Sequence, residues 1–330
     1  MSQLVTLQGA ADASLVGQIN AALQRAMGIF CGNIVYLDPH YGYDGNDGSL
    51  PTKAVQTLAR GYALLRDGRN DVLVLMQDGT TTATARLSSG FTWAKNAAHL
   101  IGTGPLTYFS QRSRIAPTSG ITAFANFFTL SGSGCLFEGI QWFHGFGTGT
   151  TSQICMTISG NRNVFQSCHL AGMGDDASAQ SAGSRSIKFS AGSENVFRNC
   201  GVGVDTVTRT QANASVEFAS GATRNVFEEC VFPFMGSAAG VLGVIVSAAA
   251  GSDRFQLFDR CKFINAIKST STQMTALSTL AASMGGMHVY KDCTLVGITE
   301  FGSDATSLAQ IYVDGASVVA ATSGIAVNPS

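Results

Sequence analysis

Acidic side chains are the first groups in this sequence whose types and spacing could do chemistry. Cleavage of a glycosidic bond requires two carboxyl groups roughly 5 to 9.5 Å apart. Asp175 and Asp176 are adjacent in a stretch rich in Gly, Ala and Ser. Glu228 and Asp259 occupy the same position of a repeat described below, and stacking of successive repeats would bring their carboxyl groups about 5 Å apart.

The neighbours of these acids favour a structural interpretation. At the same repeat position, Arg198 precedes and Lys291 follows the two acids, and Arg260 lies directly beside Asp259. Alternating charges of this kind indicate a charge ladder on a solvated or subunit-facing edge, and the Asp pair is typical of a solvated loop. We therefore assign no catalytic residue. If the protein is an enzyme after all, the candidate residues are Asp175, Asp176, Glu228 and Asp259.

No metal or cofactor site is recognisable in the sequence. The five His residues include no pair at i, i+4, and the eight Cys residues form no C-x-x-C motif. Asp44, Asn46 and Asp47 resemble part of a calcium loop, but the Glu that would complete it is missing. We expect a Gly-rich turn at this point, no metal and no cofactor.

An internal repeat of about thirty residues is the strongest pattern in the chain. Five segments align without gaps, and each carries an aromatic residue three positions before a Cys. The Cys residues are 32, 30, 31 and 32 positions apart. A sixth segment fits with Ile140 in place of Cys. The aligned segments span residues 135–142, 163–170, 195–202, 225–232, 254–263 and 288–295.

The repeat predicts an all-β right-handed parallel β-helix, in which each repeat forms one coil of a solenoid. The aromatic residue points inward, two polar residues form a corner, and the Cys points inward again, because a straight strand would alternate strictly. Stacking then aligns the Cys residues as a small apolar ladder without disulfides. The expected core ladder consists of Cys168, Cys200, Cys230, Cys261, Cys293, Phe137, Phe165, Phe197, Phe227, Phe258 and Tyr290.

Two segments near the N-terminus lie outside this repeat. Residues 1–32 are expected to form an arm with a short amphipathic helix over 12–27, since Leu15, Ile19 and Leu23 share one helical face. Residues 33–330 are expected to form one β-helix domain. A helical pattern over 51–66 predicts a capping helix that covers the open end of the solenoid.

Composition restricts the classes of partner. The net charge is −1, which is unlike a nucleic-acid-binding protein. No apolar run of about 18 residues predicts a membrane span, and the N-terminus lacks the pattern of a secretory signal. We therefore expect synthesis in a cytoplasm and no contact with nucleic acid or membrane. Only 12 % of residues are charged, which suits large contacts between subunits.

The sequence also resembles a known group of proteins. Residues 36–39 and 44–54 resemble the start of pectate-lyase-like β-helix proteins, and residues 93–102 resemble a segment of structural proteins of tailed bacteriophages. The N-x-D and G-H-G elements of polygalacturonase-like enzymes are absent. The resemblance implies a homotrimeric virion protein, either a capsid decoration protein or a tail spike.

The loop after each Cys strand is long and consists mostly of small, uncharged residues. Such loops favour packing against a sister subunit or a capsid shell. They were located at 171–185, 203–214, 233–242, 264–284 and 296–309. We therefore expect a non-enzymatic, trimeric capsid decoration (cement) protein on the phage particle, bound to the major capsid protein or other virion proteins. The alternative is a tail spike or fibre that binds or depolymerises host surface polysaccharide. A host-encoded secreted enzyme is a third, weaker interpretation.

Overall fold

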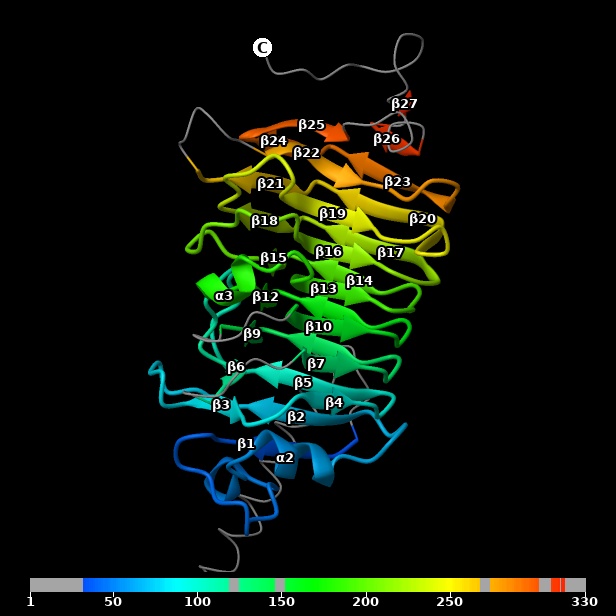
Figure 1. Ribbon diagram of the computed structural model, residues 1–330. Coiled ribbons are helices and arrows are strands. Elements are labelled where there is room, and N and C mark those ends of the chain that lie inside the picture. The colour runs from blue at the N-terminus through cyan, green and yellow to red at the C-terminus, as the bar shows by residue number, and fades with distance from the viewer. Residues whose placement is uncertain are drawn as a thin grey trace, which may run out of the picture.

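The computed structural model describes residues 32–118, 125–145, 152–267, 274–302, 310–314 and 316–317. Within them the chain winds into a right-handed parallel β-helix with three faces (Figure 1). From β2 to β25 each rung of the helix contributes one short strand to each of three sheets, which we call A, B and C in the order that the chain visits them. This confirms the fold class expected from the repeat. The expected N-terminal arm lies outside the described residues.

Sheet A contains the strands that carry the inward aromatic residues. Neighbouring strands are parallel, except for the antiparallel pair at the C-terminal end. In the part of the chain that the structure describes, its strands are β1 (Ile34–Leu37), β2 (Asp71–Leu75), β5 (Ala98–Gly102), β8 (Leu136–Glu138), β11 (Val164–Gln166), β14 (Val196–Arg198), β17 (Ala222–Glu228), β20 (Ser252–Asp259), β23 (Gly285–Lys291), β26 (Ile311–Val313) and β27 (Ala316–Ser317).

Sheets B and C close the other two faces and are parallel throughout their described strands. Sheet B contains β3 (Thr84–Leu87), β6 (Arg114–Pro117), β9 (Gln141–Phe143), β12 (His169–Ala171), β15 (Gly201–Val202), β18 (Val231–Phe234), β21 (Lys262–Asn265) and β24 (Thr294–Val296). Sheet C contains β4 (Phe91–Trp93), β7 (Asn126–Leu130), β10 (Ile154–Ile158), β13 (Arg185–Phe189), β16 (Ala214–Phe218), β19 (Leu242–Val246), β22 (Met274–Thr279) and β25 (Ile298–Gly302).

The register of the sheets follows the sequence repeat. Phe165 pairs with Phe137 on one side and with Phe197 on the other, and Phe197 pairs with Phe227. Equivalent repeat positions are therefore neighbours in space, about 4.8 Å apart in the hydrogen-bonding direction. Upstream of the repeat, β1 and β2 pair in parallel and belong to sheet A as well.

The capping helix is shorter than the pattern over 51–66 predicted. A 3-10 turn, η1 (Pro51–Lys53), is followed by an extended stretch and then by α2 (Leu58–Leu64). The Asp44 carboxylate accepts hydrogen bonds from the backbone N–H groups of Gln56 and Thr57, both at 2.8 Å, which holds these residues extended. Thr57 Oγ1 then caps α2 by accepting from the N–H of Arg60. Figure 1 shows α2 beside β1 at the N-terminal end of the solenoid.

Some segments expected as loops contain regular structure. β22 lies inside 264–284, β25 lies inside 296–309, and β18 continues to Phe234. The loop over 171–185 contains α3 (Asp176–Ala179). The hydrophobic pattern did not predict these strands because they contain small and polar residues. Ala276 and Ser278, for example, are buried in spite of their weak hydrophobicity.

Candidate functional site

The corner between sheets A and B carries the charged repeat positions. The second corner residue of successive rungs has a positive φ, which bends the chain sharply from one sheet into the next. The φ value is 53° at Glu229 and 51° at both Arg260 and Asp292. The bend directs the polar side chains of both corner positions outward, while the next residue, a Cys, returns to the interior. We call the outward row formed by Arg198, Glu228, Glu229, Asp259, Arg260, Lys291 and Asp292 the corner ladder.

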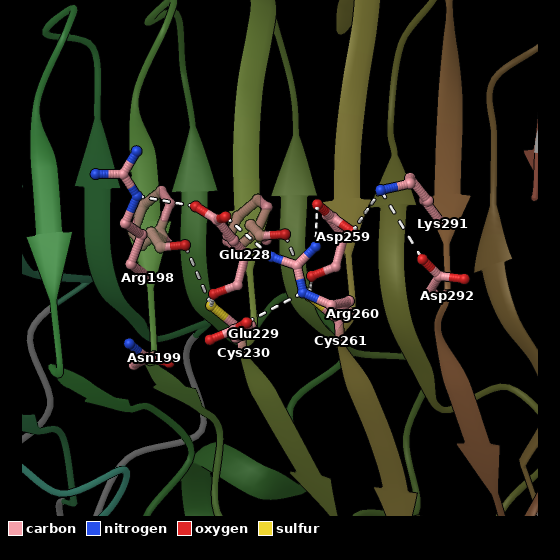
Figure 2. Close-up of polar contacts among 12 residues, drawn as sticks. Arg198, Asn199, Glu228, Glu229, Cys230, Asp259, Arg260, Cys261, Lys291 and Asp292 are labelled. Atoms are coloured by element: carbon pink, nitrogen blue, oxygen red, sulfur yellow. Dashed lines mark hydrogen bonds and ion pairs between the residues drawn. The ribbon is translucent and has the colours of Figure 1, made fainter.

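Arg260 is the centre of the corner ladder (Figure 2). Its Nη2 lies 3.0 Å from Glu228 Oε1, its Nε lies 3.0 Å from Glu229 Oε1, and its Nη1 lies 2.9 Å from Asp259 Oδ2. One guanidinium therefore binds three carboxylates from two adjacent rungs. These ion pairs with the carboxylates, led by the hydrogen bond to Glu229, raise the pKa of Arg260.

The two ends of the corner ladder are also neutralised. Arg198 Nε lies 2.9 Å from Glu228 Oε2, and Lys291 Nζ lies 3.5 Å from Asp259 Oδ1. Both oxygens of each candidate carboxylate thus face a cation. A general acid must carry a proton and a nucleophile needs a free oxygen, so this arrangement does not resemble the carboxyl pair of a glycosidase.

The other two candidate acids lie elsewhere. Asp175 is the N-cap of α3, and its Oδ1 accepts a hydrogen bond from the N–H of Ser178 at 3.0 Å. Asp176 is the first residue of that helix. Both follow a strand of sheet B, whereas Glu228 is the last residue of β17 in sheet A. The structure therefore does not bring the four candidate acids together in one site.

The Cys residues of the core ladder make hydrogen bonds that the sequence did not indicate. Cys168, Cys200, Cys230 and Cys261 are fully buried, Cys293 is partly buried, and all five thiols are free. Each Sγ donates to the carbonyl of an aromatic residue one rung below, at 3.3–3.4 Å. The thiol thus satisfies a backbone acceptor that the bend exposes. Burial raises the pKa of the Cys168 and Cys230 thiols, which keeps them protonated as donors.

The aromatic column lies against these thiols. The ring centroids of Phe165 and Phe197 are 4.5 Å apart, and those of Phe197 and Phe227 are 4.6 Å apart, with nearly parallel planes. The column continues through Phe258 to Tyr290 at 4.9 Å per step. These distances fit stacked aromatic pairs in a dry core.

A ladder of buried amides is the feature that sequence reasoning missed. Asn195 Oδ1 accepts from both the backbone N and Nδ2 of Asn163, at 3.0 Å each. Asn225 does the same for Asn195, and Gln256 Oε1 accepts from Asn225 Nδ2 at 3.0 Å. The signal was available, because an Asn begins three of the aligned repeat segments. This amide ladder satisfies backbone groups at the other end of each sheet A strand.

Metal and membrane features can be stated for the described residues only. Within them, no three His, Cys, Asp or Glu side chains lie close enough together to hold a metal ion. Among the same residues, no helix is sufficiently long and apolar to cross a membrane.

Comparison with known proteins supports the architecture. No protein-family model matches the chain, and no curated protein matches it in sequence. Among solved structures, pectate lyase Pel9A is similar with a TM-score of 0.59 at 12 % identity, covering 87 % of this chain and 69 % of that one. A rhamnogalacturonan lyase has a TM-score of 0.54 at 16 % identity, over 80 % of this chain and 68 % of the other. Pectin methylesterase from Aspergillus niger has a TM-score of 0.51 at 15 % identity, over 86 % and 84 %. At these identities the likeness concerns the fold alone.

Proposed function

We propose that this protein is a non-enzymatic structural protein of a tailed-phage particle, and specifically a homotrimeric decoration protein on the capsid surface. The observation that carries the proposal is the corner ladder. Glu228 and Asp259, the candidate acids that occupy the same position on adjacent rungs, are both bound to Arg260, so the best candidates for catalysis are used to join rungs. A rod stabilised by continuous ladders suits a role as a rigid scaffold.

The source of the virion assignment is the sequence. Residues 93–102 resemble a segment of structural proteins of tailed phages, and they form the end of β4 and all of β5 at the start of the solenoid. Small, weakly charged loops between sheets B and C favour flat packing against other subunits. This supports a decoration protein over an enzyme that releases its substrate.

The experiment is quantification of the protein on purified phage heads and tails. Copies in a fixed ratio to the major capsid protein on heads are expected, together with a mass of three chains for the isolated protein. Presence on tails only would contradict the capsid assignment, and a single-chain mass at micromolar concentration would contradict the trimer.

A second candidate function is a tail spike or fibre that binds or depolymerises host polysaccharide. The likeness of the fold to pectate lyase Pel9A and to a rhamnogalacturonan lyase favours this alternative. Incubation with host capsule or lipopolysaccharide would then release reducing ends or unsaturated sugars. Loss of that activity in Glu228→Gln or Asp259→Asn, with Asp175→Asn unaffected, would place the chemistry at the corner ladder.

A further inference from the structure

Three arginines lie together at the start of sheet B, with Arg86 and Arg114 on the outer face of its first two strands and Arg112 in the bend just before β6. Arg114 of β6 is paired with Thr84 of β3, and Arg86 lies two residues further along β3. Diagonal neighbours on one face of a sheet are roughly 7–8 Å apart, within reach of long side chains. Arg112, which is exposed, precedes Arg114 by two residues. We call these three residues the arginine patch.

The arginine patch has no counter-charge in the part of the chain that the structure describes. Burial, and then the positive charges of Arg112 and Arg86, lower the pKa of the Arg114 guanidinium. Like charges in proximity destabilise the free protein unless a ligand compensates them. The arginines that do form ion pairs are Arg66, Arg162, Arg185, Arg198, Arg224, Arg254 and Arg260.

A relay of buried polar groups fixes the orientation of Arg114. Gln141 Oε1 accepts a hydrogen bond from Arg114 Nε at 2.6 Å. Gln141 Nε2 lies 3.0 Å from His169 Nδ1, and His169 Nε2 donates to the carbonyl of Gly203 at 2.8 Å. Gln141 and His169 are only 2 % and 4 % exposed. Burial lowers the pKa of His169 to about 4, so the ring is neutral at pH 7 and Nδ1 can accept. The relay holds Nε, and the guanidinium carbon lies 5.7 Å from the centroid of the Phe143 ring. Neither contact supplies a carboxylate, so the positive charge of Arg114 stays uncompensated among the described residues.

An exposed apolar segment adjoins the arginine patch. Residues 103–112 connect β5 to β6 and extend along the A/B corner as a tongue. Phe109 packs edge-on against His169 at a centroid distance of 5.2 Å, and Gln111 Nε2 donates to the Ser167 carbonyl at 2.7 Å. Despite these anchors, Leu106 remains 54 % exposed, and Tyr108 and Phe109 are each 38 % exposed. The tongue ends at Arg112, and Gly104 near its beginning lies beside the Arg112 backbone, so the two features are continuous.

We propose that the arginine patch and the tongue form one interface, which binds an acidic, partly apolar surface of a different protein. Guanidinium groups held in place would pair with Asp and Glu carboxylates, while Leu106 and Tyr108 pack on apolar groups. Aromatic residues and arginine are the side chains enriched at protein interfaces. This inference rests on the proposed function, in which the partner is the shell protein of the particle.

A second copy of this chain does not fit as the partner. Many of its described acids are already engaged: Glu194, Glu217, Glu228 and Asp259 in ion pairs, Asp175 in the cap of α3, and Asp44 in hydrogen bonds to the backbone before α2. The net charge of −1 does not favour nucleic acid either. An acidic protein surface is therefore the occupant that the charges favour.

The test uses phage particles that lack this protein and the purified full-length chain. The wild-type chain is expected to bind the particles, and the variant Arg86→Gln/Arg112→Gln/Arg114→Gln to bind about tenfold more weakly or worse. The matched control Lys53→Gln/Arg69→Gln/Lys262→Gln removes the same charge from exposed residues away from the patch and should bind as the wild type does. Loss of the hydrogen bond from Arg114 to the buried Gln141 offsets the relief of mutual repulsion, so the patch variant should melt close to the wild-type temperature. The double variant Arg86→Gln/Arg112→Gln, which keeps that hydrogen bond, should also bind more weakly, which separates lost binding from lost folding.

The outcomes distinguish the two proposals. Failure of the wild-type chain to bind particles would overturn the proposed function, and the interface with it. Equal binding by wild type and patch variant would overturn the interface alone. The interface would also be wrong if the patch variant loses its oligomeric state, which would indicate a second copy, or if it loses affinity only for an acidic polysaccharide. A patch variant that melts well below the control would assign the arginines to folding.

Discussion

At the scale of single residues, Arg260 shows how one side chain can decide the character of a site. Its left-handed backbone, with φ of 51°, costs energy for a non-Gly residue, yet it aims the guanidinium at three carboxylates. Bidentate and forked geometry of this kind is specific to arginine, since a lysine ammonium is a point charge. The corner ladder thus depends on the side chain more than on the backbone preference.

We predict that Arg260→Gln lowers the thermal midpoint of the protein by a few degrees, because Glu228, Glu229 and Asp259 then repel one another. Arg260→Lys should lose part of this amount, since it keeps the charge without the fork. Thermal unfolding followed by circular dichroism at low ionic strength and in 1 M salt is the measurement. The difference should shrink in salt, which screens exposed charges. A difference that grows in salt would indicate a packing defect instead.

His288 is a titratable residue that lies in the core. It is fully buried against Phe218 and Phe258, and neither ring nitrogen has a hydrogen-bond partner among the described residues. Burial lowers the pKa of His288 to about 3. In the unfolded chain the imidazole takes up a proton below roughly pH 6.5, whereas in the folded chain it stays neutral until near pH 3. Acidification between these values therefore favours unfolding.

We predict that His288→Leu reduces the loss of stability between pH 6.5 and pH 4 by about 1.4 kcal/mol per pH unit at most. Urea unfolding at several pH values measures this slope. His288→Gln should flatten the slope too, because it removes the titrating group. Only the leucine variant should also gain stability at pH 7, since it removes unsatisfied polar atoms. An unchanged slope in both variants would show that His288 is not the group that titrates.

At the scale of elements, the strands of sheet A are joined by more than their backbone ladder. The amide ladder supports one end of each strand and the thiol–carbonyl contacts support the other. Both ends are places where the chain leaves a strand and exposes backbone groups. A buried polar group without a partner is costly, so these side chains are needed at each rung.

Asn195→Ala is predicted to destabilise the protein by about 2–4 kcal/mol, because several buried hydrogen bonds lose their partner. The losses include the contacts with Asn163, Asn225 and the Gly160 carbonyl. Denaturant unfolding gives the free energy directly. The matched variant Asn195→Gln should lose less, since Gln256 occupies this column naturally. If alanine is tolerated as well as glutamine, the amide ladder does not stabilise the fold.

At the scale of the whole molecule, the solenoid is a stack in which each rung contacts its neighbours. The core is continuous from β1 to β26, so no rung in the described part buries its aromatic residue without those above and below. In such folds stability is roughly a sum of rung terms and interface terms. The C-terminal end is the less protected one, since Cys293 is only partly buried whereas the earlier Cys residues are fully buried.

This arrangement predicts the order in which thiols become reactive. Among the thiols of the described residues, an aromatic disulfide reagent should modify Cys293 first in native protein, with Cys168, Cys200 and Cys230 protected until global unfolding. Mass spectrometry of trypsin fragments after timed labelling assigns each site. The reason is that a reagent in solution reaches only a thiol that is exposed to solvent, and Cys293 is partly exposed whereas the earlier thiols are buried. Rapid labelling of Cys200 under native conditions would contradict the stacked column.

Much of this architecture was determined by the sequence alone. The spacing of Cys and aromatic residues at about thirty positions specifies which residues stack, because strand periodicity and rung stacking are local and regular properties. The same regularity made the fold and the strands of sheet A predictable. The Asn residues that begin the repeat segments could also have predicted the amide ladder, although their polar character suggested only turns.

Only the tertiary structure decided the partners of individual side chains. That Arg260 would bind Glu228, Glu229 and Asp259 at once depends on the bend and rotamer at each corner, which spacing does not specify. The tongue is a stronger case, because Tyr108 lies near Asn199, 91 positions along the chain. Such contacts arise where an irregular loop crosses several rungs, and no periodic pattern encodes its path. The arginine patch and its relay through His169 were hidden for the same reason.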